Sequence, residues 1–130
     1  MGLDMYAWRV KAEDVVNDFQ IAKYDDGDGS KVEEIFYWRK HHDLHGWMER
    51  LYRAKGGTKE SFNCVPVRLY DFDLDNLLLD VVNKNLPVTR GFFFGDNPQD
   101  DESVLNDIKF ISLAKEAIKA GDAVYYDSWW

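Results

Sequence analysis

Several features that define other classes of protein are scarce or missing in this sequence. The 130 residues include a single cysteine, Cys64, so the chain can form no internal disulfide, zinc ribbon or C-x-x-C redox pair. No stretch approaches the roughly 20 apolar residues of a membrane-spanning helix. Residues 1–10 include Asp4 and Arg9 and lack the apolar run of a signal peptide. We therefore expect a cytoplasmic protein that makes no contact with a membrane.

Basic residues are in the minority. Sixteen Lys and Arg residues stand against 24 Asp and Glu residues, which gives a formal net charge of −8. This charge repels a phosphate backbone, so we expect no direct binding to nucleic acid. An acidic surface usually serves solubility, but carboxylates can also imitate phosphates and occupy a basic partner. An acidic nucleic-acid mimic is therefore one of the functions to consider.

The common catalytic and nucleotide-binding motifs are also absent. The sequence contains no G-x-x-x-x-G-K-[ST] loop, no G-x-G-x-x-G segment after a strand and no G-x-S-x-G elbow. We expect no cofactor and assign no catalytic residue. The sequence leaves enzymatic activity open and favours its absence.

Aromatic residues are abundant. Five Trp, seven Tyr and eight Phe make up 15% of the chain. A chain of this length buries roughly two-thirds of the surface that it exposes when unfolded. We therefore expect one globular domain over residues 1–130, in which most of the rings form the core.

Hydrophobic periodicity predicts an α+β fold, with a small antiparallel sheet of three or four strands packed against about three helices. The predicted strands are 3–10, 62–70, 91–95 and 123–130, and the predicted helices are 31–54, 74–83 and 101–120, with 31–54 central. Residues 35–38 fit a short strand before the central helix equally well, and residues 11–23 fit a short helix.

Single residues refine this outline. Pro66 cannot donate to a sheet ladder, so its strand is expected at an edge. Asp73 can cap the helix at 74–83. In the helix at 101–120 the spacing of Leu105, Ile108 and Ala114 predicts the side that faces the core.

The histidines and the cysteine are candidates for chemistry. His41 and His45 lie one helical turn apart, so both rings could reach one metal ion, but no third ligand is nearby in the sequence. We therefore prefer hydrogen-bonding roles for them and expect no metal. Cys64 could act as a nucleophile with a histidine as its base, although a lone cysteine is more often a small buried apolar residue.

Cations next to indoles suggest a binding surface. Trp38, Arg39 and Lys40 are consecutive, and Trp47 follows on the predicted central helix. Such a group could bind an anionic or planar ligand, or it could be ordinary packing of long side chains on rings. Trp129 lies near the chain end, where side chains are usually exposed, so it either seals the domain or faces a partner.

Six short segments form a specific combination that spans the chain. They are Met1-Gly-Leu-Asp-Met-Tyr6, Tyr37-Trp-Arg-Lys40, Leu44-His-Gly-Trp47, Asn63-Cys64, Gly91-Phe-Phe-Phe-Gly95 and Tyr125-Tyr-Asp-Ser-Trp129. Together they resemble an uncharacterised family of bacteriophage and prophage proteins. The resemblance implies a protein that acts in the cytoplasm of a host cell. It also implies that one site draws on Asp4, Tyr6, Trp38, Arg39, His45, Trp47, Cys64, Phe93 and Trp129.

These observations favour a non-catalytic accessory protein that binds a host or phage protein, in host interaction or against host defence. The alternatives are a small-molecule-binding protein or enzyme built from residues 38–47 and 91–95, and the acidic nucleic-acid mimic. A homo-oligomer with an aromatic interface is a further possibility. The candidate binding residues are Asp4, Tyr6, Trp38, Arg39, Lys40, His41, His45, Trp47, Cys64, Phe93 and Trp129.

Overall fold

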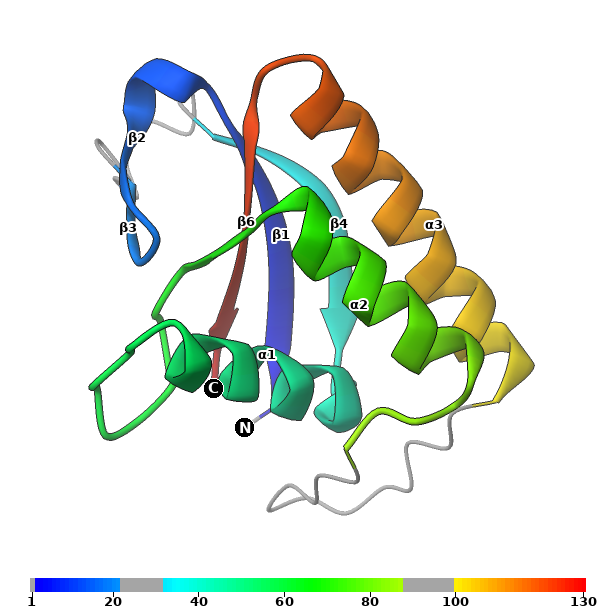
Figure 1. Ribbon diagram of the computed structural model, residues 1–130. Coiled ribbons are helices and arrows are strands. Elements are labelled where there is room, and N and C mark those ends of the chain that lie inside the picture. The colour runs from blue at the N-terminus through cyan, green and yellow to red at the C-terminus, as the bar shows by residue number, and fades with distance from the viewer. Residues whose placement is uncertain (1, 22–31, 88–99) are drawn as a thin grey trace.

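The computed structural model describes residues 2–21, 32–87 and 100–130, which form a layer of helices on a β-sheet (Figure 1). Four antiparallel strands follow the order β4-β1-β6-β5, and β2 and β3 form a separate two-stranded ribbon. The strands are β1 (Asp4–Val10), β2 (Val15–Asn17), β3 (Gln20–Ile21), β4 (Val32–Arg39), β5 (Val67–Leu69) and β6 (Ala123–Trp129). The predicted α+β class and the predicted size of the sheet are confirmed.

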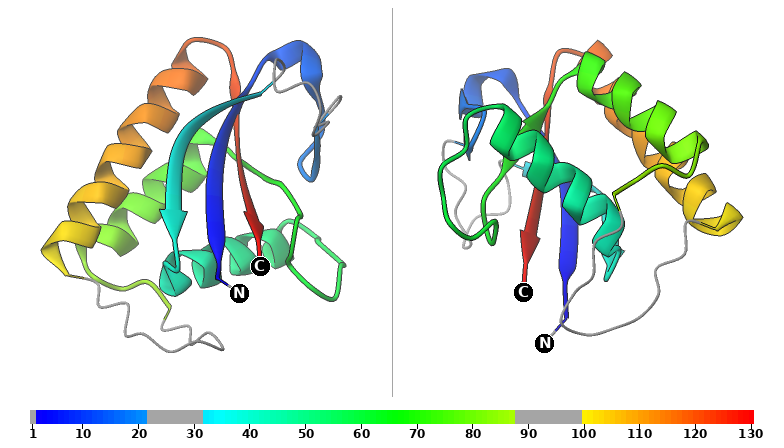
Figure 2. Two further views of the ribbon diagram at one scale, coloured as in Figure 1. Left: turned by 180° about the vertical axis from the view of Figure 1, so that it is seen from behind. Right: turned by 60° about the horizontal axis from the view of Figure 1, so that its bottom comes forward.

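All three helices in the described segments lie on one face of the sheet. They are α1 (His42–Ala54), α2 (Asp71–Val82) and α3 (Asp101–Lys119). Figure 2 shows the opposite face, seen from behind, with no described helix over it and with the β2–β3 ribbon beside one end. None of these three helices has the length and apolar character needed to cross a membrane.

The predicted central helix begins later than expected, because residues 32–39 form a strand. β4 pairs with β1 along its whole length, with a bulge opposite the Ala7–Trp8 step. Lys40 then adopts a left-handed φ of 59° and turns the chain into α1. The helix therefore covers only 42–54, and the alternative of a strand at 35–38 is the correct one.

Other boundaries differ in smaller ways. Of the predicted strand 62–70 only β5 is regular; it lies at the sheet edge directly after Pro66, as expected. Residues 11–21 contain no α-helix but a 3₁₀ turn (Ala12–Asp14) and the β2–β3 ribbon. The strand predicted at 91–95 lies outside the described residues.

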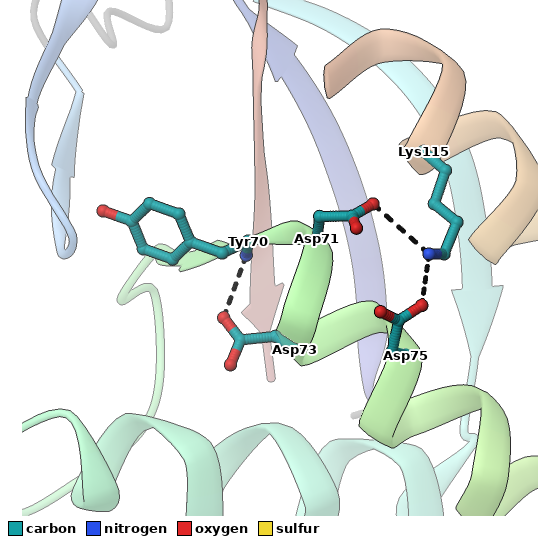
Figure 3. A network of polar contacts seen from close by, with 5 residues as sticks. All are labelled: Tyr70, Asp71, Asp73, Asp75 and Lys115. Carbon is teal, nitrogen blue, oxygen red and sulfur yellow. Dashed lines mark hydrogen bonds and ion pairs between the residues drawn. The ribbon is translucent and has the colours of Figure 1, made fainter. Parts of the chain in front are cut away.

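α2 begins three residues before its predicted start, and it is joined to α3 (Figure 3). The Asp73 carboxylate accepts a hydrogen bond from the backbone N–H of Tyr70, 2.9 Å away, so it acts from inside the first turn. On α3, the Lys115 ammonium donates to Asp75 and, at 3.2 Å, to Asp71. These carboxylates raise the pKa of Lys115, the hydrogen bond to Asp75 having the largest effect.

The core lies between the sheet and the helices. Met5 and Ala7 of β1 point toward the helices, whereas Tyr6 and Trp8 point to the other face, as the alternation predicts. The predicted inward side of α3 is confirmed at Ala114, which is buried, and at Ile108, which packs against the core, but it is wrong at Leu105, which is 67% exposed. The buried positions of the helix are Asp107, Phe110, Ile111, Ala114 and Ala117. The Phe110 ring packs edge-on against Trp38 of β4.

Candidate functional site

The sheet face without helices gathers four residues into what we call the aromatic face: Asp4, Tyr6, Tyr37 and Trp129. Tyr6 is paired with Tyr37 on β4, and Asp4 is paired with Trp129 on β6. The Tyr6 and Tyr37 ring centroids are 5.4 Å apart, and the Tyr37 hydroxyl donates to Asp4 Oδ1 at 2.5 Å. Tyr37 is 44% exposed and Trp129 is 61% exposed. Rings of this size on an open sheet face offer a contact surface to another molecule.

The aromatic face is acidic. Burial raises the pKa of the Tyr6 hydroxyl, and the neighbouring carboxylates of Asp4, Glu34 and Asp127 raise it further. The one cation among the residues paired with Asp4 and Tyr6 is Arg39, which lies opposite Asp4 in the register. A cationic group from a partner would therefore meet both carboxylates and ring faces here.

A second site is a cleft of about 330 Å³ between β4 and α3. It is lined by residues 36–39, by His41 and by Ser103, Asn106 and Asp107 of α3. Asp107 is only 2% exposed, and each of its oxygens accepts one hydrogen bond. Trp38 Nε1 donates to Oδ1 at 3.1 Å, and His41 Nε2 lies 2.9 Å from Oδ2.

His41 reaches this cleft because of the turn that precedes it. The left-handed Lys40 ends β4, and His41 follows as the N-cap residue of α1. Its side chain forms no capping hydrogen bond, and its ring bonds to Asp107 instead. The buried carboxylate therefore fixes the orientation of the imidazole, because the hydrogen bond at one ring nitrogen determines which nitrogen carries the proton.

His45 has a structural role in a different place. Its Nδ1 lies 2.6 Å from the Tyr126 hydroxyl, and its ring packs against Phe62 and Trp130. Burial, with a smaller contribution from His42, lowers the pKa of His45 to about 4. Burial also raises the pKa of Tyr126, so the hydroxyl that shares this hydrogen bond with Nδ1 keeps its proton.

His41 and His45 therefore do not converge on one ion, since their rings bond to different elements. Within the described segments no group of three or more His, Cys, Asp or Glu side chains is arranged to hold a metal. Trp47 donates from Nε1 to Asp80 of α2 at 2.8 Å, which joins two helices.

Cys64 belongs neither to the aromatic face nor to the lining of the cleft between β4 and α3. Cys64 is exposed rather than buried, has a left-handed φ of 59° and donates its amide to the Ser128 carbonyl at 2.8 Å. It lines a separate cleft of about 300 Å³ beside Tyr52. Lys40 is exposed in the turn before α1. Phe93 lies outside the described residues.

The structure thus divides the single site that was expected. Asp4, Tyr6 and Trp129 lie on the aromatic face, whereas Trp38 and His41 line the cleft. Arg39 is paired with Asp4 and also lines the cleft. Sequence reasoning missed Asp107, because carboxylates are too numerous in an acidic chain to stand out. The signal was its position one turn before Phe110 and Ile111, on the buried side of α3.

Comparison of the chain with protein-family models, with curated proteins and with solved structures finds no match.

Proposed function

We propose that this chain is a phage- or prophage-encoded accessory protein that binds a host or phage protein through its aromatic face. The phage origin and the host cytoplasm as the place of action depend on the sequence resemblance. The mode of binding depends on the structure. The proposal assigns no catalytic residue to this face.

The observation that carries the proposal is the exposure of Tyr37 and Trp129 on a sheet face that bears carboxylates. Trp and Tyr are the residues most enriched among those that dominate binding energy at protein interfaces. The Trp129 side chain is 61% exposed, so most of its surface remains in contact with water in the free protein. Its contact area is therefore available to a partner.

The charges on the aromatic face indicate the chemistry of that partner. Asp4 and Glu34 lie beside Tyr6, and the chain as a whole has a formal charge of −8. A second copy of the chain would bring the same negative charges together, which disfavours self-association through this face. A protein surface with Lys or Arg side chains beside apolar groups would gain from both the carboxylates and the rings.

A pull-down with matched variants tests the proposal. The tagged protein is incubated with a lysate of the bacterium that carries the gene, alongside Trp129→Ala and, as a control, Leu79→Ala. Leu79 is 62% exposed on α2, on the helix side of the molecule. We expect the wild type and the Leu79 variant to retain the same protein, and the Trp129 variant to bind it roughly 30-fold more weakly once purified.

Retention by all three proteins alike would contradict the proposal, and so would a partner without a basic surface. The salt dependence of the purified complex separates the two versions of the function. A nucleic-acid mimic would lose affinity steeply with added salt, because its contacts are mainly between charges. A partner held largely by the rings would lose affinity only modestly.

A further inference from the structure

We propose that the cleft between β4 and α3 binds a small, uncharged, planar molecule that donates an N–H or O–H group to Nδ1 of His41. The cleft lies toward the helix side of the sheet and shares Tyr37 with the aromatic face. Phe36 and Trp38 alternate with Tyr37 along β4, so they point to the helix side of the sheet. The inference therefore stands whether or not the protein partner exists.

The hydrogen bonds of His41 identify the ring atom that would accept a hydrogen bond from the ligand. Both oxygens of the Asp107 carboxylate can only accept, so Nε2 of His41 carries the proton that is shared with it. In the neutral imidazole, the other nitrogen, Nδ1, is then left with a lone pair. Within the described residues the ring bonds only to Asp107, and the side chain forms no capping hydrogen bond. Nδ1 is thus an acceptor with no protein donor, in a residue that lines the cleft.

The surroundings restrict the charge of the ligand. Arg39 also lines the cleft, but its guanidinium lies beside Gly2, so an anion would approach the buried Asp107 carboxylate with the imidazole between them. A cation cannot reach that carboxylate, because Asp107 is 2% exposed and its two oxygens are occupied by Trp38 and His41. An uncharged hydrogen-bond donor avoids both costs.

The size and lining of the cleft restrict the shape of the ligand. Its volume of about 330 Å³ lies at the lower end of small-molecule sites. Ser103 and Asn106 are three residues apart on α3, so they present a hydroxyl and an amide on the same side of that helix. The rings of Phe36 and Trp38 supply an aromatic wall on the β4 side. A single planar ring with polar groups at its rim matches this combination.

NMR provides a direct test, because the Trp38 indole N–H reports on the cleft through its bond to Asp107. In ¹⁵N-labelled protein this resonance is assigned by its loss in Trp38→Phe. The probes are uracil, 2-pyridone, 3-hydroxypyridine and phenol, each compared with its N- or O-methylated counterpart. We expect at least one probe to shift the resonance with saturation at about millimolar concentration, and its methylated counterpart to bind at least roughly tenfold more weakly.

The matched variant is His41→Gln. The glutamine amide nitrogen can occupy the place of Nε2 and donate to Asp107, but glutamine has no acceptor in the place of Nδ1. We expect this variant to keep the Trp38 indole resonance and to lose binding of the probe. The inference is overturned if no probe gives a saturating shift, or if the variant binds the same probe with unchanged affinity.

Asp107→Asn separates positioning from a merely structural role. An asparagine amide can donate to Nε2 of His41, which moves the imidazole proton to Nδ1. We expect the ¹⁵N shifts of the His41 ring to exchange their protonated and unprotonated values, and the donor probe to lose affinity. A variant that keeps both the original tautomer and the binding would contradict the role of Asp107.

Discussion

The side chain of Asn63 holds the backbone of Trp130 by two hydrogen bonds, both of 3.1 Å. Nδ2 donates to the Trp130 carbonyl, and Oδ1 accepts from the Trp130 amide. The Trp130 ring lies edge-on to His45, with the centroids 4.9 Å apart. Trp130, which follows the last residue of β6, is therefore held in place, and its ring completes the burial of His45.

Asn63→Ala should release Trp130. Loss of two hydrogen bonds and of part of the ring packing should lower the free energy of unfolding by about 1–2 kcal/mol, since a typical hydrogen bond contributes about 1 kcal/mol. Urea unfolding measures this change, and faster hydrogen exchange of the Trp130 amide locates it. Unchanged exchange at that amide would show that the tether does not hold the residue.

The buried His45 predicts a dependence of stability on pH. Its pKa is about 4 in the folded protein and 6.5 in the unfolded chain, so below pH 6.5 the unfolded state binds the proton more tightly. The stability that depends on a neutral His45 is fully present above pH 6.5 and is lost as the pH falls toward 4. At pH 5 the free energy of unfolding should therefore be about 2 kcal/mol lower than at pH 7.

His45→Asn supplies the comparison, because the asparagine amide can form a hydrogen bond with the Tyr126 hydroxyl in place of Nδ1 and does not titrate. Urea unfolding of both proteins from pH 7 to pH 4.5 should show a smaller loss in the variant. Identical pH profiles would mean that His45 does not carry this dependence.

Trp38→Phe tests how much the hydrogen bond from Trp38 to the buried Asp107 carboxylate stabilises the fold. The variant keeps most of the ring but removes the donor to Asp107 Oδ1, which leaves one oxygen of a buried carboxylate without its partner. We expect a loss of about 1–3 kcal/mol in the free energy of unfolding. Trp129→Phe is the control, since that ring is 61% exposed, and it should change stability by less than about 0.5 kcal/mol. Equal effects would contradict the importance of the bond.

Gly57 is required by the ring of Tyr52. A Cβ built on Gly57 would meet that ring in direct overlap, and Tyr52 is a buried residue of α1. Gly57→Ala should therefore force the ring or the turn to move, at a cost of about 1–3 kcal/mol. Gly2→Ala is the control, because its Cβ would lie 3.4 Å from the nearest atom of Arg39. Thermal unfolding of the two variants checks the difference.

Local patterns predicted the elements whose signals were simple. β1 and β6 alternate in the expected way, and α3 occupies nearly the predicted range. β4 was ambiguous because the consecutive residues 35–38 are apolar and continue a helical stripe into α1. What decides in favour of a strand is pairing with β1, which lies about 30 residues earlier in the sequence. Lys40 separates β4 from α1 in a left-handed conformation, but a lysine, unlike a glycine, does not indicate such a turn in the sequence.

The candidate sites were only partly predictable for the same reason. Asp107 acquires its role from Trp38 and His41, which are 69 and 66 residues away, and no local spacing connects them. The resemblance pointed to Asp4, Tyr6, Arg39 and Trp129, and the sheet register places these on one face. His45 and Trp47 lie elsewhere because they are part of α1, on the helix side of the sheet.

Site-specific photo-crosslinking can show which face of the protein contacts a partner. A photoreactive phenylalanine analogue replaces Tyr37 on the aromatic face in one protein and Leu79 on α2 in another, and both are irradiated in the host lysate. We expect a covalent adduct to one basic protein from position 37 and none from position 79. Adducts from position 79 alone, or the same adducts from both positions, would contradict the proposal.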